Sequence, residues 1–184
     1  WFRACGTVSG TIMEEIRMVI EETYRRAAAE LHKEYPAVDA HLDLAGELLF
    51  RVQNKEENPL RGRYLEHLRA GGFRLIVSSV YLRDSELPEA GLRNALDQIS
   101  VLLDEVEKNR EFCMVRTRED MERALEEGRI GILLYMEGLD CIGKDLRLLR
   151  VLWELGVRGA SLTWSRRNDL ASGCCRAGEQ VQIP

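Results

Sequence analysis

His41 and Asp43 combine an imidazole nitrogen with a carboxylate oxygen two positions apart. They follow the apolar residues Ala37 and Val38, which predict the start of a short strand. Residues i and i+2 of a strand point to the same side, so both side chains would reach one point. A neutral imidazole beside a hard carboxylate suits zinc or a similar divalent ion. The spacing therefore predicts part of a metal site, although a His-x-Asp pair also arises often by chance.

Glu137 supplies a second carboxylate at the end of another apolar run. It directly follows residues 130–136, and Gly138 behind it lets the chain turn sharply away. A carboxylate in such a place can bridge two metal ions, as two-metal hydrolytic sites require. A glutamate after a strand can instead stabilise the start of the next helix. Spacing alone leaves both roles open.

The elements that would carry these residues alternate between helix and strand. Apolar residues at helical spacing, with their start and stop signals, predict helices over 11–33, 60–70, 90–109, 117–128 and 145–155. Continuous apolar runs, typical of parallel strands covered on both faces, predict strands over 37–41, 73–82, 112–115, 130–136 and 160–164. Asn54, Asn58 and Pro59 predict a polar loop between the first strand and the second helix.

Repeated strand–helix units predict an α/β fold with a parallel sheet. An open doubly wound sheet and the first five strands of a TIM-type (β/α)8 barrel both fit this order. No glycine-rich phosphate loop follows the first strand, which argues against a nucleotide-binding sheet. We expect a partial barrel catalytic domain over residues 36–184, preceded by a helical extension over residues 1–35. The carboxyl ends of the strands, where chemistry sits in such a barrel, hold the three candidate ligands.

Three segments, in order along the chain, resemble the membrane (renal) dipeptidase family of zinc peptidases. Residues 38–43 (Val-Asp-Ala-His-Leu-Asp) are similar to the first metal-binding motif of that family. Residues 135–138 (Tyr-Met-Glu-Gly) resemble its bridging-glutamate motif, and residues 162–168 (Leu-Thr-Trp-Ser-Arg-Arg-Asn) resemble its Leu-Thr-His/Trp segment. Residues 72–81 also resemble its second strand. The order and spacing of three motifs make the resemblance more specific than any one of them.

The resemblance implies a metallo-hydrolase barrel that holds two zinc ions and hydrolyses dipeptides. His41 and Asp43 would bind one zinc, and Glu137 would bridge both ions as a ligand and catalytic residue. A hydroxide shared by the ions would attack the scissile carbonyl of the dipeptide. Trp164 falls where some members of the family carry a substrate-binding histidine and others a tryptophan. Independently of the resemblance, Tyr81 near the end of the second strand is also expected to contact the substrate. Members of the family often form homodimers, which makes a homodimer an expectation here.

The family also uses two further metal-binding histidines and an aspartate from later strands. The remaining histidines of this sequence, His32 and His67, fall before the first strand and on a predicted outer helix, and are not expected to bind metal. The second zinc would then have Glu137 alone, whereas a catalytic zinc usually has three protein ligands. We therefore expect an incomplete site.

Two alternative functions stay open. The chain could be a non-catalytic, truncated half barrel, whose open strand edges would favour self-association. It could also be another amidohydrolase-like metal hydrolase, although relatives of that kind more often carry His-x-His on the first strand, where this chain has Asp43.

Several neighbouring residues are expected to serve the structure rather than the chemistry. Ser78 and Ser79, at the end of the second strand, would pack or cap a helix. Arg166 would be a solvated loop residue, Asn168 would hold the loop after the fifth strand, and Trp153 would lie in the core.

Composition excludes some partners. The 184 residues carry a net charge of −5 and show no basic, aromatic-rich patch, so a nucleic-acid partner is not expected. The longest apolar runs, such as residues 130–136, are too short to cross a bilayer. The five cysteines fit neither a zinc ribbon nor a Cys-x-x-Cys redox pair. Without a signal-peptide pattern near residue 1, we expect a cytoplasmic protein.

Overall fold

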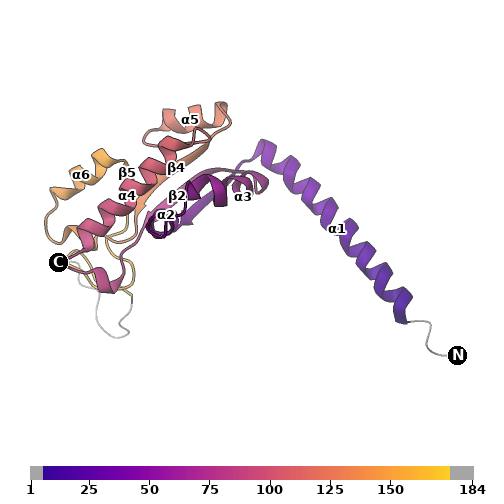
Figure 1. Ribbon diagram of the computed structural model, residues 1–184, viewed down its shortest axis with the longest axis horizontal. Coiled ribbons are helices and arrows are strands. Elements are labelled where there is room, and N and C mark those ends of the chain that lie inside the picture. Colours follow the sequence, from indigo (N-terminus) through magenta and orange to yellow (C-terminus); the bar gives the residue numbers. More distant parts are fainter. Residues whose placement is uncertain (1–5, 175–184) are drawn as a thin grey trace. The chain divides into compact units, whose positions relative to one another are not determined.

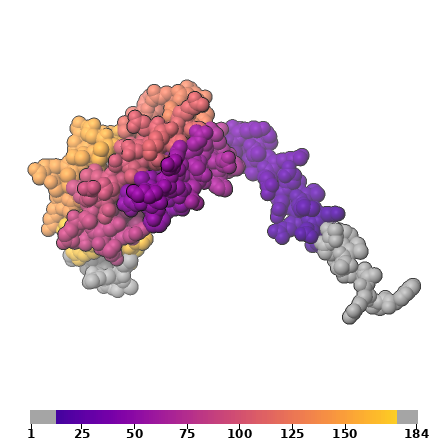
Figure 2. Space-filling model, viewed as in Figure 1, coloured from indigo at the N-terminus to yellow at the C-terminus, as the bar shows by residue number. Residues whose placement is uncertain are grey.

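The computed structural model describes residues 6–174, and the side chains of residues 13–174. It divides into two compact units, residues 1–37 and residues 38–184. The first unit holds one long helix, α1 (Gly6–Glu34), drawn in indigo in Figure 1 and in space-filling form from residue 13 in Figure 2. The helix predicted over 11–33 is confirmed and begins five residues earlier than predicted. Pro36 follows its end, as expected for a residue that cannot continue a helix.

The second unit is built on a five-stranded sheet (Figure 1). Its strands are β1 (Ala37–Leu42), β2 (Phe73–Val80), β3 (Phe112–Met114), β4 (Ile130–Met136) and β5 (Val157–Ala160). The sheet runs in the order β1-β2-β4-β3, and β5 also pairs with β4. All three pairings of β4 are parallel. The predicted α/β fold with a parallel sheet is confirmed.

Strands β3 and β5 share one edge of β4. Gly131 of β4 pairs with β2 on one side and β3 on the other, whereas Leu134 pairs with β2 and β5. A strand residue has only two sides on which to pair, so β3 and β5 must lie one after the other along the same edge. β4 is therefore bonded on both edges over most of its length.

Helices connect the strands. They are α2 (Leu44–Gln53), α3 (Leu65–Ala70), α4 (Gly91–Lys108), α5 (Arg118–Glu126) and α6 (Leu148–Leu155). A π-helical turn, η1 (Leu60–Tyr64), leads into α3, and two 3-10 turns, η2 (Asp84–Glu86) and η3 (Asp140–Ile142), follow β2 and β4. None of the helices in the described part of the chain is both long and apolar enough to span a lipid bilayer.

The two faces of the sheet differ in burial. Side chains alternate between the faces of a strand, and the even-numbered residues from 76 to 80 in β2 and from 130 to 136 in β4 are buried, as Ile76, Ile132 and Leu134 show. They belong to one apolar core that includes Ile99 and Leu102 of α4. Odd-numbered residues such as Leu133 and Tyr135 are only partly buried. In the described residues the odd-numbered face is thus less completely buried than the even-numbered one, so the expectation of strands covered on both faces is only partly met there.

Three local predictions are also wrong. The segment predicted as a polar loop contains α2, because Leu44, Ala45 and Leu48 are buried at helical spacing before the loop residues begin. The fifth strand ends at Ala160, where its pairing with Met136 ends, instead of spanning 160–164. Trp153 is 53% exposed, and the guanidinium carbon of Arg158 lies 3.8 Å from the centroid of its ring.

Candidate metal centre

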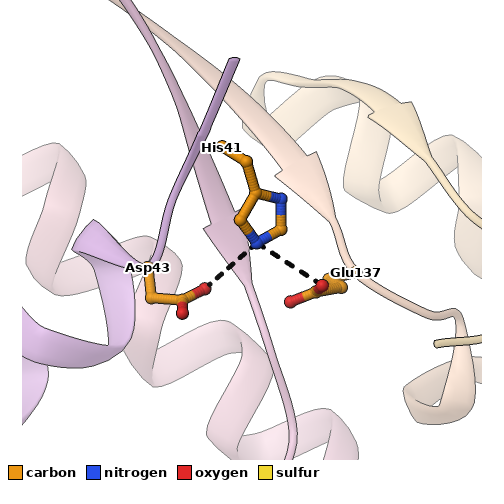
Figure 3. Close-up of side chains that lie close together, drawn as sticks. All are labelled: His41, Asp43 and Glu137. Carbon is orange, nitrogen blue, oxygen red and sulfur yellow. Dashed lines mark ion pairs between the residues drawn. The ribbon is translucent and has the colours of Figure 1, made fainter. Parts of the chain in front are cut away.

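Three predicted ligands meet at the carboxyl ends of β1 and β4. Nε2 of His41 lies 3.6 Å from Oδ1 of Asp43 and 3.4 Å from Oε1 of Glu137 (Figure 3). The three ligand atoms all lie within 4.8 Å of one another. Residues nearly one hundred positions apart thus converge because β1, β2 and β4 are consecutive strands of the sheet. The structure thus brings the three predicted ligands together into one group of donors.

Asp43 is positioned by a neighbouring strand. It occupies the N-cap position of α2 but makes no side-chain capping bond to that helix. Instead, its Oδ1 accepts a hydrogen bond of 2.6 Å from the hydroxyl of Ser79 on β2. Aspartate is a favoured capping residue, so this carboxylate is turned away from its ordinary local role and toward His41.

Ser79 therefore orients a candidate ligand, and the expectation that it serves only in packing or capping is wrong. Ser79 is 1% exposed, and Asp43, which accepts its hydrogen bond, lies 36 positions earlier in the chain. Ser78 points to the opposite face and is fully buried there. No local sequence signal distinguishes the two serines, because strand parity alone decides which of them reaches Asp43.

Glu137 does not cap a helix. The next helical turn, η3, has Leu139 at its N-cap, and the backbone N–H of Glu137 donates to the carbonyl of Val80. Its side chain is 15% exposed. Burial raises the pKa of this carboxyl, the charge of His41 opposes that shift, and the nearby Asp43 adds to it. A cation at this position would offset the cost of burying the carboxylate.

Gly138 allows the turn that follows Glu137. Its φ is +90°, and a Cβ at this position would lie 2.6 Å from Oδ2 of Asp140 and 3.3 Å from the backbone nitrogen of Trp164. Its own N–H donates to the hydroxyl of Ser161, 2.9 Å away. Only glycine fits both the backbone angle and the space.

The two distances from Nε2 of His41 fit a shared divalent ion better than a hydrogen-bonded cluster. A charged hydrogen bond would bring nitrogen and oxygen to roughly 2.7–2.9 Å, which is shorter than either distance from His41. Ligands about 2.0–2.1 Å from a tetrahedral zinc lie about 3.3–3.5 Å from one another. The separations of 3.4 and 3.6 Å match that spacing. One nitrogen and two carboxylate oxygens are also donors that zinc accepts.

The two predicted substrate-contacting residues, Tyr81 and Trp164, lie against each other. Their ring centroids are 4.9 Å apart at an interplanar angle of 76°, an edge-to-face pair. Tyr81 directly follows β2, and Trp164 lies in the loop after β5. Both residues therefore lie at the carboxyl ends of the strands, where the candidate ligands also lie. Trp164 is 49% exposed, which leaves part of its indole free for contact.

Arg166 supports this aromatic pair, and its prediction as a solvated loop residue is wrong. Its side chain is 20% exposed, and its Nη2 donates to the carbonyl of Leu82 at 2.6 Å. Its guanidinium carbon lies 5.8 Å from the centroid of Tyr81, and its Nε lies 3.0 Å from Oδ1 of Asp84. Asn168 holds the same loop, as expected: its side chain donates to Leu162 and accepts from two backbone N–H groups.

A cavity of about 550 Å³ adjoins the ligand cluster. Asp43, Ser79 and Tyr81 line it on the side of the strands, and Glu47 of α2 and Gln98 of α4 contribute from the helices. The contribution of α2 was not predicted, because that segment was expected to be a loop. The apolar residues Leu44, Ala45 and Leu48, which recur at helical spacing, were the sequence signal that could have predicted this helix.

The other two histidines lie outside the cluster. His67 is exposed on α3, and His32 belongs to the first unit, where its Nδ1 lies 3.3 Å from the carbonyl oxygen of Tyr35. In the residues that the structure describes, neither histidine joins a group of three potential ligands.

Comparison with known proteins identifies the family to which the chain is similar. The sequence pattern of the membrane dipeptidase family, peptidase family M19, matches residues 25–182. Dipeptidase 3 of Rattus norvegicus is 29% identical over 147 residues, which cover 77% of this chain and 30% of that protein. Dipeptidase ataJ of Aspergillus terreus is 28% identical over 163 residues, which cover 80% of this chain and 40% of that protein.

Solved structures agree. The crystal structure of dipeptidase AC, a metallo peptidase of family M19, matches with a TM-score of 0.63 at 26% identity, over 71% of this chain and 43% of its own. A metallo peptidase from Rhodobacter sphaeroides shares the fold with a TM-score of 0.64 at 23% identity, over 72% of this chain and 46% of its own. The chain thus spans less than half the length of each relative. Its matched segment, which contains all three candidate ligands, shows that it belongs to the membrane dipeptidase family.

Proposed function

We propose that this chain supplies the amino-terminal part of a zinc-dependent dipeptidase active site. The observation that carries the proposal is the convergence of His41, Asp43 and Glu137, whose ligand atoms lie within 4.8 Å of one another, in a chain of the membrane dipeptidase family. A metal is implied by the family, and the donor set favours zinc among divalent ions.

Each residue would have a distinct task. His41 and Asp43 would hold one zinc, and Ser79 would keep Asp43 aimed at it through their hydrogen bond. Glu137 would share its carboxylate between that ion and a second one. When bound, zinc would lower the pKa of a coordinated water toward neutrality and polarise the scissile carbonyl. Tyr81 and Trp164 would pack against the dipeptide as an aromatic wall.

The donors present limit what this chain does by itself. Three protein donors satisfy one zinc and leave a fourth position for water. A second ion would share Glu137 and would need further donors, which the described residues do not bring to the cluster. We therefore expect tight binding of one zinc per chain, with two-zinc dipeptide hydrolysis requiring additional ligands.

Zinc stoichiometry and hydrolysis test the proposal together. Zinc bound to the purified chain is measured by isothermal titration and elemental analysis, and hydrolysis is followed for a panel of L,L and L,D dipeptides. Glu137→Gln should abolish zinc-dependent activity wherever activity is found, and should weaken zinc binding, because it removes an anionic ligand. Glu66→Gln, on the exposed face of α3, is the matched control and should bind zinc like the wild type. Unchanged zinc binding in Glu137→Gln would contradict the ligand role.

Lactone and phosphotriester substrates separate the dipeptidase from another amidohydrolase-like enzyme. Hydrolysis of these esters without hydrolysis of any dipeptide would contradict the dipeptidase proposal. One bound zinc with no turnover of any substrate is the result that three donors predict for this chain alone, and it fits the non-catalytic half barrel equally well.

A further inference from the structure

The cavity beside the metal centre extends between α2 and α4, two helices that contact each other. Its volume is about 550 Å³, which is enough for an amino-acid side chain. Asp43 lines it and is also one of the three candidate metal ligands. A substrate whose reacting carbonyl lay at the metal centre could therefore place one of its side chains in this cavity.

The lining of the cavity is acidic. Asp43, Glu47 and Glu86 contribute carboxylates, whereas Arg83 is the only positively charged residue among the described residues of the lining. Glu86 is held in place, because its Oε2 accepts the backbone N–H of Arg83 at 2.8 Å. Glu47 forms an ion pair with Arg51, which lies outside the lining. Acidic surfaces are common, so these charges indicate a binding site only together with a further observation.

Gln98 of α4 supplies that observation, because it leaves a buried acceptor unpaired. The residue is 5% exposed, and its Nε2 donates to the backbone carbonyl of Tyr81 across 2.8 Å. A carbonyl oxygen can only accept, so this bond fixes the orientation of the amide. Oε1 of Gln98 therefore points away from Tyr81, and it has no hydrogen-bond partner among the described residues. A buried acceptor without a donor is unfavourable, so a ligand that brings a donor would be favoured here.

Gly46 leaves the space beside this acceptor open. A Cβ at Gly46 would lie 3.4 Å from Oε1 of Gln98, so any side chain there would begin in contact with the acceptor. Gly46 lines the cavity and belongs to α2, where glycine is less favourable than alanine. The negative end of the Gln98 amide is thus directed at the one part of the cavity wall in α2 that carries no side chain.

We propose that this cavity binds a basic side chain of the substrate, lysine or arginine, an inference that rests on the proposed dipeptidase function. The cationic group would be attracted by the carboxylates of Glu47 and Glu86 and would offer a donor to Oε1 of Gln98. Leu49 and Phe50, which also line the cavity, would pack against the methylene stem. The cavity would thereby select dipeptides that carry a basic residue.

Binding of matched dipeptides tests the proposal without requiring turnover. The full chain is titrated, with and without one equivalent of zinc, with lysyl-alanine and alanyl-lysine and with counterparts in which norleucine replaces lysine. Norleucine keeps an apolar stem and lacks the ammonium group. We expect at least one lysine dipeptide to bind about tenfold more tightly than its norleucine counterpart, the effect of one hydrogen bond to a charged group. Equal binding of each pair, or no binding of any dipeptide, would overturn the proposal. Tighter binding of glutamyl-alanine or alanyl-glutamate would also overturn it and would point to Arg83.

Neutralising one carboxylate tests the role of the cavity charge. Glu86→Gln keeps an acceptor for the N–H of Arg83 and removes the charge, so the preference for lysine should fall about two- to fivefold. Glu89→Gln is the matched control, because Glu89 is exposed, lies three positions later and is not part of the lining. An equal loss of preference in both variants would show that the cavity is not the source of the effect.

Filling the cavity tests the place of binding. Gly46→Met puts a side chain over Oε1 of Gln98 and should abolish the preference for lysine. Gly62→Met is the control, since Gly62 is exposed and a Cβ there meets nothing within 4 Å. Circular dichroism checks that both variants keep the fold. A preference that survives both Glu86→Gln and Gly46→Met unchanged would overturn the assignment to this cavity.

Failure of this inference can be distinguished from failure of the dipeptidase proposal. A chain that binds zinc through Glu137 but does not prefer lysine would overturn the inference alone. A chain that binds no zinc but prefers lysine, and loses that preference in Gly46→Met, would overturn the dipeptidase proposal alone. The two results are separable because Glu137 is not among the described residues that line the cavity.

Discussion

The hydroxyl of Ser79 donates to Oδ1 of Asp43 across 2.6 Å, and that same oxygen faces Nε2 of His41 at 3.6 Å. Oδ1 of Asp43 is therefore held by a hydrogen bond from β2 and is directed toward the candidate metal position. Partners that hold a ligand in this way set its direction and basicity, and are often nearly as important as the ligand itself.

Replacing Ser79 by alanine should weaken zinc binding by roughly 10- to 100-fold, because Asp43 loses the bond that orients it. The free carboxylate could then rotate to cap α2, the role that its position favours. Isothermal titration with zinc measures the effect. Ser78→Ala is the matched control, since Ser78 is fully buried on the other face of the same strand. Equal zinc affinity in the two variants would contradict the supporting role of Ser79.

Gly138→Ala should destabilise the fold and disturb the metal centre. The substitution adds a Cβ at φ +90° and drives it against Asp140 and the backbone of Trp164. The left-handed backbone alone costs about 1–2 kcal/mol for an L-residue, and the contacts add to this. Urea unfolding measures the loss of stability. Zinc titration measures how much the displacement of Glu137 weakens zinc binding.

Gly128→Ala isolates the backbone contribution. Gly128 also has a positive φ, +68°, but a Cβ there meets nothing within 4 Å. This variant should lose about 1–2 kcal/mol and keep its zinc affinity. If both glycine variants lost the same stability and the same affinity, the crowding around Gly138 would have no consequence.

Asp120→Asn should lower stability at neutral pH but not in acid. The carboxylate of Asp120 accepts the backbone N–H groups of Arg116 and Thr117, both at 3.0 Å, in the capping box of α5. These bonds, that of Arg116 foremost, lower its pKa below the usual 3.8. A lowered folded-state pKa means that the stabilisation is present above pH 3.8 and is lost as the pH falls through the folded value.

Urea unfolding at pH 7 and in acid checks this sign. At pH 7 the variant should be less stable than the wild type by about 1 kcal/mol, the usual value of a cap. The difference should narrow in acid, where the wild-type carboxyl is also uncharged. Glu119→Gln, in the same first turn, is the control and should show little effect. A gap that widened in acid would have the wrong sign.

Cys141 should resist alkylation in the folded protein. Burial raises the pKa of its thiol to about 11, so little thiolate forms at pH 8. Cys174 is exposed and should react readily. Brief iodoacetamide treatment followed by peptide mass spectrometry compares the two. Labelling of Cys141 at the rate of Cys174 would show that the core around it opens freely.

The sequence predicted best what local pattern determines. Strand β4 was predicted to the residue, because the apolar run Ile130–Met136 is bounded by the Gly128 turn and by the polar Glu137. The bounds of β5 were missed because pairing with β4 sets them, and Gly156 at φ +109° turns the chain into the strand at once. Local composition does not record either constraint.

Within the site, the sequence predicted the candidate ligands but not the residues that hold the site in place. His41, Asp43 and Glu137 stand in short motifs, and the structure brings them together, although their binding of metal remains a prediction. Ser79 and Arg166 act through partners 36 and 84 positions away, Asp43 and Leu82. Only the strand order and the loop path bring such partners together. The cytoplasmic location expected from the sequence also remains a prediction.

The position of the ligands in the sheet has a dynamic consequence. Glu137 follows β4, which is bonded on both edges, whereas His41 belongs to β1, at an end of the strand order. Strands at an edge open locally far more easily than strands at the centre. An ion held by both would act as a cross-link that fastens a strand at the end of the sheet to a strand bonded on both sides. Zinc should therefore slow amide hydrogen exchange in β1 much more than in β4.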